Sequence, residues 1–185
     1  MPRRVVATTY LTLDGYFDEP GLWSMPFWSD EAAQFKSREL VASDAQLLGR
    51  LTYEGFAAAW PTMQGTGEFG EKMNTMPKYV ASRTLDTATW NATIIKGEVA
   101  DKVRELKQED GGDLLIAGSG QLIDYLTTHD LIDEYRMMVY PIVIGNGTKR
   151  LFNGVPRRTF TLVQSVTLPK GVVINTYHPA APASE

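Results

Sequence analysis

The sequence predicts an α/β protein with a mixed, mostly parallel sheet of about eight strands, flanked by about four helices. Three observations lead to this fold class. Strand-like and helix-like segments alternate through the first two thirds of the 185 residues. Two apolar runs end in glycine directly before a helix, as parallel strands do before their crossover helices. The last two apolar segments alternate with polar residues, which is typical of a β-hairpin.

The chain opens with a predicted strand, a loop and a helix. Residues 3–13 (RRVVATTYLTL) are rich in β-branched side chains, whereas 14–28 (DGYFDEPGLWSMPFW) collect glycine, proline and aromatic residues. Ser29 can cap a helix over 30–42, whose first turn carries acidic residues that the helix dipole favours.

The next segment predicts a buried strand at 44–49 (DAQLLG) and a helix at 52–60, which Pro61 stops. Residues 62–76 (TMQGTGEFGEKMNTM) are rich in glycine and methionine without a clear period, so we expect a mobile surface loop. Short strands follow at 78–82 and 90–95.

The second half predicts a helix at 98–110 with one apolar face, which Gly111 and Gly112 end. The other expected elements are strand 113–118, helix 120–128, strand 134–145 and a terminal hairpin of 158–168 and 171–178. We expect one domain over 1–179 and a disordered polar tail at 180–185.

Composition excludes several classes of protein. The formal charge of -4 and the lack of a basic block argue against nucleic-acid binding. There is no cysteine, and His129 and His178 are isolated, so no metal site is expected. No apolar run could span a bilayer or serve as a signal peptide, which favours the cytoplasm.

Two strand-to-helix junctions could carry chemistry, LLGRLTYE at 47–54 and LLIAGSGQLIDYL at 114–126. Ligands of open α/β sheets bind outside the carboxyl ends of the strands, where such turns lie. One interpretation is that the glycines only let a helix leave a strand tightly. The other is that backbone N–H groups hold phosphates there, with Arg50 beside Gly49.

A third stretch, VASRTLD at 80–86, ends a strand in Ser82 and Arg83. Beside Arg50 and Thr52, these groups could surround one phosphate ester such as an adenosine 2′-phosphate, which would favour NADP over NAD. The alternative is a pair of solvated arginines. GSGQLI fails the dinucleotide fingerprint at Ile123, and neither a P-loop nor a G-x-S-x-G elbow occurs.

These stretches resemble one family. LTLDGY, LLGRLTYEGF, VASRTL, GGDLLIAGSGQLIDYL and LIDEYRMMVYPIVIGNGTKRLF follow each other in the order found in the dihydrofolate-reductase-like superfamily. The closer resemblance, over about Val5 to Tyr177, is to the reductase domain of bacterial riboflavin biosynthesis (the RibD C-terminal domain) as a single-domain protein. The resemblance implies NADPH bound across the carboxyl edge of the sheet. The implied cofactor contacts are Gly49, Arg50, Thr52, Ser82, Arg83, Gly118, Ser119, Gly120, Gln121 and Leu122.

The implied activity is NADPH-dependent reduction of a small pteridine-like or aminopyrimidine substrate. Asp14 and Glu31 are candidate proton donors, Glu31 because EAAQFK resembles the segment of folate reductases whose carboxylate contacts the pterin. A first-turn carboxylate can also be only a dipole partner. Tyr16 and Trp28 are candidate substrate contacts, since aromatic side chains can stack on a planar heterocycle or close the core.

Other outcomes stay open at this point. One is a flavin- or dinucleotide-binding reductase outside the riboflavin pathway, with FMN as its cofactor, and another is a ligand-binding homologue without catalysis. Residues 10–35 contain no Lys or Arg for a ribosyl-phosphate substrate. Relatives commonly pair, so we expect a homodimer with the apolar strand MMVYPIVI at its contact.

Overall fold

The computed structural model describes residues 2–180, and its strands form one eight-stranded sheet in the order β4-β3-β2-β5-β1-β6-β8-β7. Strands β1 to β6 run parallel, whereas β8 and β7 are antiparallel to their neighbours and form the terminal hairpin. The predicted mixed, mostly parallel sheet is therefore confirmed. The strands are β1 (Val5–Leu11), β2 (Ser43–Gly49), β3 (Lys78–Ala81), β4 (Ala92–Ile95), β5 (Asp113–Ala117), β6 (Glu134–Val139), β7 (Phe160–Thr167) and β8 (Val173–Pro179).

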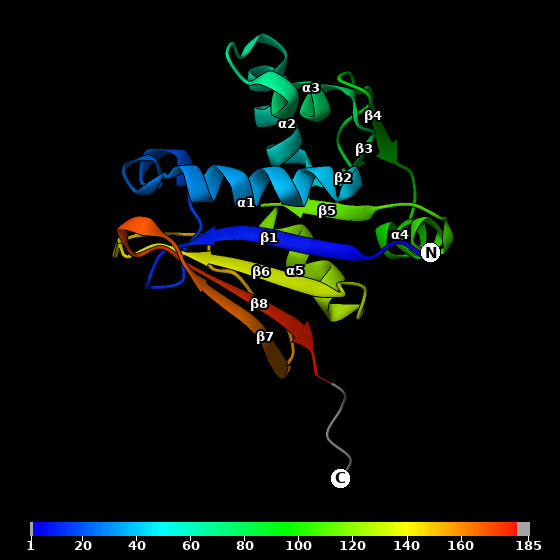
Figure 1. Ribbon diagram of the computed structural model, residues 1–185. Helices are drawn as coiled ribbons and strands as arrows, with labels where there is room; N and C mark the ends of the chain where they lie inside the picture. Colours follow the sequence, from blue (N-terminus) through cyan, green and yellow to red (C-terminus); the bar gives the residue numbers. More distant parts are fainter. Residues whose placement is uncertain (1, 181–185) are drawn as a thin grey trace.

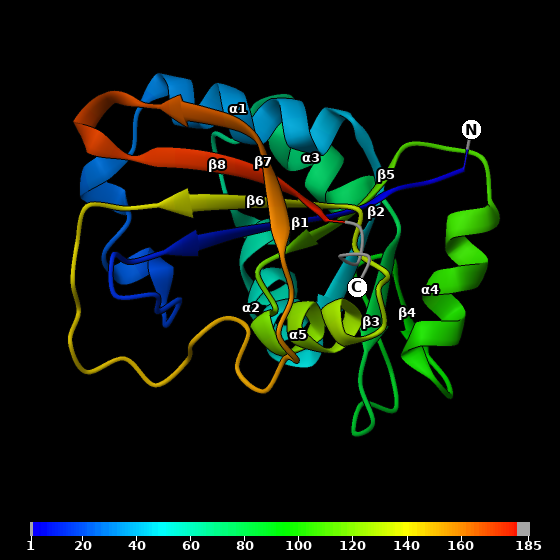
Figure 2. The same cartoon turned by 90° about the horizontal axis from the view of Figure 1, so that it is seen from below.

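Five α-helices cover the two faces of this sheet (Figures 1 and 2). Seen from below, α1 lies on one side of β1, β6 and β8, and α5 lies on the other (Figure 2). Helices α1, α2 and α3 share the first face, and α4 and α5 share the second. Their bounds are α1 (Asp30–Val41), α2 (Arg50–Ala59), α3 (Gly67–Thr75), α4 (Val99–Gln108) and α5 (Gly120–Thr128).

The apolar runs of the parallel strands are buried on both faces. In β1, Val5 and Ala7 pack towards α4 and α5, while Val6 packs in the cluster that includes Leu40 of α1. Side chains of a strand point alternately to the two faces, so a strand covered by helices on both sides needs apolar residues throughout. This explains why the sequence shows continuous rather than alternating apolar runs.

The chain connections diverge between β2 and β5. From β2 the chain passes through α2 and α3 to β3 on one side of the sheet, whereas from β5 it passes through α5 to β6 on the other side. The two helices α2 and α5 also cover opposite faces. In open α/β sheets, ligands bind at the carboxyl ends of strands whose connections diverge in this way.

The expected loop at 62–76 is wrong, because the structure forms helix α3 there. Phe69, Met73 and Met76 follow a spacing of four and three residues, and the two methionines are buried in the cluster that also contains Leu40 and Leu115. This apolar face is not evident in the sequence, because the helix is short and the segment contains three glycines. Packing against α1 and the sheet therefore decides the helix more than local propensity does.

The strand predicted over 134–145 ends early, and the part that forms β6 lies inside the sheet. Strand β6 stops at Val139, before Pro141, and it pairs with β1 on one edge and β8 on the other. Met137 and Met138 are buried on opposite faces of the protein's own core, and Tyr140 is fully buried as well. The β6 part of the segment MMVYPIVI is therefore interior, whereas Val143 in the part that follows β6 is 63% exposed.

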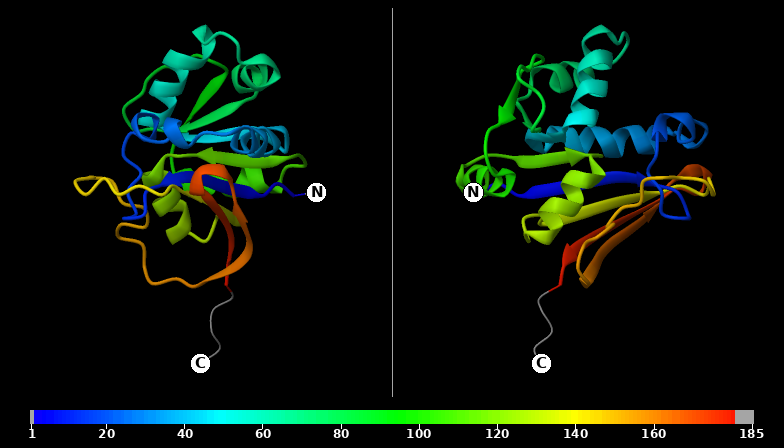
Figure 3. Two further views of the ribbon diagram at one scale, coloured as in Figure 1. Left: turned by 60° about the vertical axis from the view of Figure 1, so that its left-hand side comes forward. Right: turned by 180° about the vertical axis from the view of Figure 1, so that it is seen from behind.

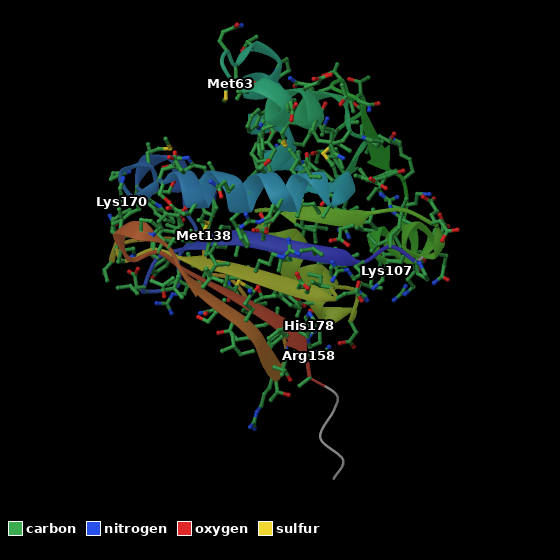
Figure 4. The ribbon with its side chains drawn as sticks, in the orientation of Figure 1. Met63, Lys107, Met138, Arg158, Lys170 and His178 are labelled. Atoms are coloured by element: carbon green, nitrogen blue, oxygen red, sulfur yellow. The ribbon has the colours of Figure 1, made fainter. Side chains whose placement is uncertain are left out.

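The β7–β8 hairpin ends the described part of the chain. Lys170 lies at the turn between β7 and β8, whereas His178 lies near the end of β8 (Figure 4). The expected disordered tail at 180–185 lies outside the described residues, except for Ala180, whose N–H donates to the Thr159 carbonyl. None of the helices within residues 2–180 combines the length and the apolar character that crossing a membrane requires.

Candidate functional site

The carboxyl ends of the parallel strands bring three of the motifs to one edge of the sheet. Gly49 is the last residue of β2, and it pairs with Ala81, the last residue of β3. On the other side of β2, strand β5 ends at Ala117, whose neighbour Gly118 donates its N–H to the Thr8 carbonyl of β1 at 2.9 Å. The predicted convergence of the three stretches follows from this register.

The turn between β2 and α2 does not need the conformational freedom of glycine. Gly49 has φ −76° and ψ 159°, an extended conformation open to any residue, and α2 begins at Arg50. A Cβ atom on Gly49 would lie 3.4 Å from the Cβ and Oγ atoms of Ser119. The absence of a side chain at Gly49 leaves room for the close approach of the Ser119 side chain. This close approach, rather than an unusual φ, distinguishes the position.

The turn between β5 and α5 has the opposite character. Gly118 has φ 72°, and Ser119 has φ 62° and ψ 57°, so two successive residues lie in the left-handed region before α5 begins at Gly120. Nothing lies within 4 Å of a Cβ built on Gly118. The left-handed turn therefore presents an open backbone at the start of α5.

One serine side chain joins the two turns. The Gly49 N–H donates to the Ser119 Oγ atom at 2.9 Å, and that hydroxyl donates to the Thr52 Oγ1 atom at 2.8 Å. The bridge spans β2, α2 and α5, whose residues are about seventy positions apart in the chain. The structure thus brings three of the predicted cofactor residues into direct contact.

The start of α5 carries backbone donors that a phosphate could use. The N–H groups of Gly120 and Gln121 have no acceptor among residues 2–180, as is usual for the first residues of a helix. The Leu122 N–H already donates to the Ser119 carbonyl at 2.8 Å, and its side chain packs in the core. The donor set therefore fits an anion at Gly120 and Gln121, while Leu122 is held by its own contacts.

The predicted arginines lie at the ends of neighbouring strands. Arg50 donates through one guanidinium nitrogen to both carboxylate oxygens of Glu54, at 3.0 and 3.2 Å. Arg83 is exposed and has no hydrogen bond or ion pair within the described part of the chain. The Ser82 hydroxyl accepts the N–H groups of Thr84 and Leu85, which shapes the turn after β3.

The first loop packs directly on the start of α5. A Cβ on Gly120 would fall 2.1 Å from the tip of the Phe17 ring, so only glycine allows this contact. The Phe17 N–H donates to the Lys149 carbonyl at 3.1 Å, which ties the first loop to the connection between β6 and β7. These two segments, blue and yellow, run beside each other in both views of Figure 3.

Two carboxylates fasten these loops. Asp14 accepts the N–H groups of Gly145 at 2.9 Å and Ile144 at 3.4 Å, and Asp18 accepts those of Thr148 and Lys149. A hydrogen bond from the Thr12 hydroxyl, together with these backbone donors, lowers the pKa of Asp14 below its usual value. The carboxylate of Asp14 is thus held in its charged form in this arrangement.

Basic side chains reach the first loop from the second. The guanidinium of Arg150 lies 4.7 Å from the centroid of the Tyr16 ring, and the two residues form an antiparallel bridge. Lys149 is its neighbour and is exposed. The sequence shows no basic residue between positions 10 and 35, and the fold supplies two from a segment more than a hundred residues away.

Most of the loop aromatics close the core. Trp23 and Phe27 pack edge-on against Tyr140, with ring centroids 5.3 and 6.0 Å away, and Trp28 packs on the same cluster. Burial raises the pKa of Tyr140 and of its neighbour Tyr10 well above the usual range. Lys170 donates to the Pro26 and Trp28 carbonyls, which fixes this segment to the β7–β8 turn (Figure 4).

Glu31 lies away from the two glycine turns. It is exposed in the first turn of α1 and lines a hollow of about 400 Å³ between α1 and the β7–β8 hairpin, together with Phe35 and Arg38. Among the described residues, no hydrogen bond joins Glu31 to Asp14, and Trp28 packs on the Tyr140 cluster whereas Tyr16 contacts Arg150. The candidate catalytic and substrate roles of these residues stay predictions.

Three comparisons with known proteins agree with this geometry. The family model of the RibD C-terminal domain matches residues 3–174. The protein YyaP of Bacillus subtilis (strain 168), described as uncharacterised, is 28% identical over 181 residues, 95% of each chain. A pyrimidine reductase-like protein from Corynebacterium diphtheriae has a TM-score of 0.70 at 11% identity, covering 97% of this chain and 93% of its own.

A dihydrofolate reductase from Enterococcus faecalis, solved with NADP(H), has a TM-score of 0.67 at 16% identity, covering 96% of this chain and 97% of its own. The sheet order, the terminal hairpin and this likeness define a dihydrofolate-reductase-like fold. Within that class, the chain belongs to the RibD C-terminal domain family.

Proposed function

We propose that the protein is an NADPH-dependent reductase of a small pteridine-like or aminopyrimidine substrate. The observation that carries the proposal is the Ser119 bridge, which joins the two glycine turns at the carboxyl ends of β2 and β5. NADPH carries a 2′-phosphate on its adenosine in addition to its pyrophosphate, so it needs two anion sites rather than one. The family of the chain supports the same reading.

Two groups of residues would hold the cofactor. The pyrophosphate would bind to the open backbone at the start of α5, which is formed by Gly118, Ser119, Gly120 and Gln121. Leu122 would hold this turn through its N–H bond to the Ser119 carbonyl. The second group would take the adenosine half and its 2′-phosphate, where guanidinium groups give the strongest recognition. Its members are Gly49, Arg50, Thr52, Ser82 and Arg83.

When bound, the nicotinamide would supply a hydride for a C=N or C=O carbon. The protein's own part is to orient the two molecules, exclude water and deliver a proton to the heteroatom. Asp14 has a lowered pKa and is held by backbone N–H groups, so it serves better as an anchor of the first loop than as an acid. Glu31 remains the candidate acid, and it would need the first loop and α1 to enclose the substrate near it.

The substrate side of the proposal gains from Lys149 and Arg150. An anionic substituent on the heterocycle would meet these cations beside Tyr16, whose ring already carries the Arg150 guanidinium. Tyr16 would line this space, whereas Trp28 packs on the Tyr140 cluster and its role as a substrate contact stays a prediction. Turnover assays with pteridines and aminopyrimidines, each with and without a phosphate group, would identify the substrate by NADPH oxidation.

A tryptophan-fluorescence titration with NADPH and NADH tests the cofactor assignment. We expect micromolar affinity for NADPH and much weaker binding of NADH. The ratio of the two dissociation constants should be smaller in Arg50→Ala and in Arg83→Ala. Arg104→Ala on α4 is the matched control, because within residues 2–180 this exposed arginine pairs with Asp101 on its own helix and with no other carboxylate. Absence of binding by either nucleotide would overturn the proposal, and a yellow purified protein would favour FMN instead.

We further propose a homodimer in the cytoplasm. Because β6 itself is interior, the contact would involve exposed apolar residues outside it, such as Val143 after β6 or Leu162 and Val163 on the edge strand β7. A sedimentation experiment that finds only monomer mass would remove the dimer.

A further inference from the structure

The ion pair between Arg50 and Glu54 has a consequence for how the protein would choose between nucleotides. Arg50 is the first residue of α2, and its guanidinium reaches forward along the helix to Glu54, one turn away. A residue at the start of a helix is close to the carboxyl edge of the sheet, but this contact draws the charge away from that edge. The Arg50 guanidinium, which is well placed for a phosphate at this edge, is therefore held at Glu54 instead.

The pair is weak enough for a ligand to displace it. The side chains of Arg50 and Glu54 are 42% and 43% exposed, and such pairs contribute little because water and salt screen them. A phosphate dianion offers the guanidinium a stronger, bidentate partner than a surface carboxylate does. Arg83 at the end of neighbouring β3 has no competing carboxylate within the described residues.

We propose that Glu54 is a specificity-determining residue that restrains Arg50 and so sets how strongly the protein prefers a phosphorylated dinucleotide to an unphosphorylated one. The inference rests on the proposed NADPH site. Glu54 touches neither the substrate nor the reacting atoms, and it acts through Arg50 alone. Removing its carboxylate frees the guanidinium, which strengthens binding only of ligands that carry the extra phosphate.

The test is a set of dissociation constants for NADPH and NADH, measured at low ionic strength on four proteins. These are the wild type, Glu54→Gln, Arg50→Gln and the double variant. We expect E54Q to bind NADPH about threefold more tightly, as the release of an exposed i,i+4 pair allows, and to bind NADH unchanged. In the R50Q background, E54Q should change the free energy of NADPH binding by less than about half of the change that it causes when Arg50 is present.

The double variant separates the restraint of Arg50 from the general field of a carboxylate, because that field acts with or without Arg50. Glu105→Gln on α4 is the matched control, since Glu105 also forms an exposed ion pair on a helix, with Lys102. It should leave both affinities unchanged. Circular dichroism of each variant checks that α2 stays folded.

The outcomes separate this inference from the proposed function. If the wild type binds neither nucleotide, the proposed function fails and the role of Glu54 falls with it. If the wild type prefers NADPH but E54Q leaves that preference unchanged, or E54Q acts equally in the R50Q background, only the role of Glu54 is overturned.

Discussion

The two glycine turns at the carboxyl edge look alike in the sequence and differ in the structure. At the end of β2, Gly49 has an ordinary extended backbone, and its missing side chain leaves room beside Ser119. At the end of β5, Gly118 and Ser119 are both left-handed, and Gly120 lies under the Phe17 ring. One turn uses glycine for space, and the other uses it for conformation and space together.

This difference teaches that the same residue type can be required for separate physical reasons a few ångströms apart. It also predicts a graded response to adding a methyl group. A Cβ should be costly where it meets a ring, moderately costly where φ is positive, and cheap where the backbone is ordinary and the nearest atom is 3.4 Å away.

Gly120→Ala should have the largest effect on stability. Its Cβ would overlap the Phe17 ring at 2.1 Å, and relief of such overpacking costs about 2 kcal/mol in the free energy of unfolding. Urea denaturation measures this change. Phe17→Ala in the same protein should remove the penalty, because alanine otherwise favours a helix over glycine. Equal stability of Gly120→Ala and the wild type would disprove the contact.

Gly118→Ala should be the next most harmful. No atom lies within 4 Å of the added Cβ, so the cost comes only from the backbone at φ 72° and amounts to about 1.5 kcal/mol. Gly118→Asn is the control, since asparagine tolerates the left-handed region better. If urea denaturation ranks asparagine below alanine here, the conformational explanation is wrong.

Ser119→Ala should cost about 1 kcal/mol, because the Gly49 N–H loses its acceptor and the Thr52 hydroxyl loses its donor. It should also weaken NADPH binding by loosening one turn from the other. Ser119→Gly removes the same hydroxyl but relaxes the positive φ, so we expect it to unfold at higher urea than Ser119→Ala. The reverse order would show that the positive φ of residue 119 carries no cost for alanine, which would contradict the left-handed conformation as the reason for the difference.

Gly49→Ala should have the smallest effect on stability, within about 0.5 kcal/mol. Its φ suits alanine, and its contact with Ser119 is an ordinary one. NADPH affinity should nevertheless fall about tenfold if the bare backbone admits a phosphate, since each 1.4 kcal/mol of lost contact is a factor of ten. Unchanged affinity together with unchanged stability would show that this glycine is only part of a turn.

The sequence predicted the turns but not the bridge between them. Register between β2, β3 and β5 follows from parallel strands and apolar runs, so the convergence of Gly49, Ser82 and Gly118 could be expected. The Ser119 contact depends on the left-handed backbone of that residue, which no pattern of residue types announces. The same holds for Glu54, whose pairing with Arg50 is visible as an i,i+4 spacing but whose importance needs the geometry.

Contacts between distant loops were the other part that could not be predicted. Asp14 and Asp18 accept hydrogen bonds from backbone N–H groups of residues 144–149, and neither segment has a sequence pattern that predicts this pairing. Helix α3 was missed because its buried methionines stand among glycines. The aromatic loop left two possibilities, and packing of Trp23 and Phe27 on Tyr140 selects the core for these two rings.

The most direct test of the central claim is an NMR titration of isotope-labelled protein with NADPH, following the backbone amides of both turns. We expect the signals of Gly49 and Gly120 to shift together and to give one dissociation constant, because the Ser119 bridge makes the two turns a single site. Shifts confined to one turn, or two different constants, would contradict it.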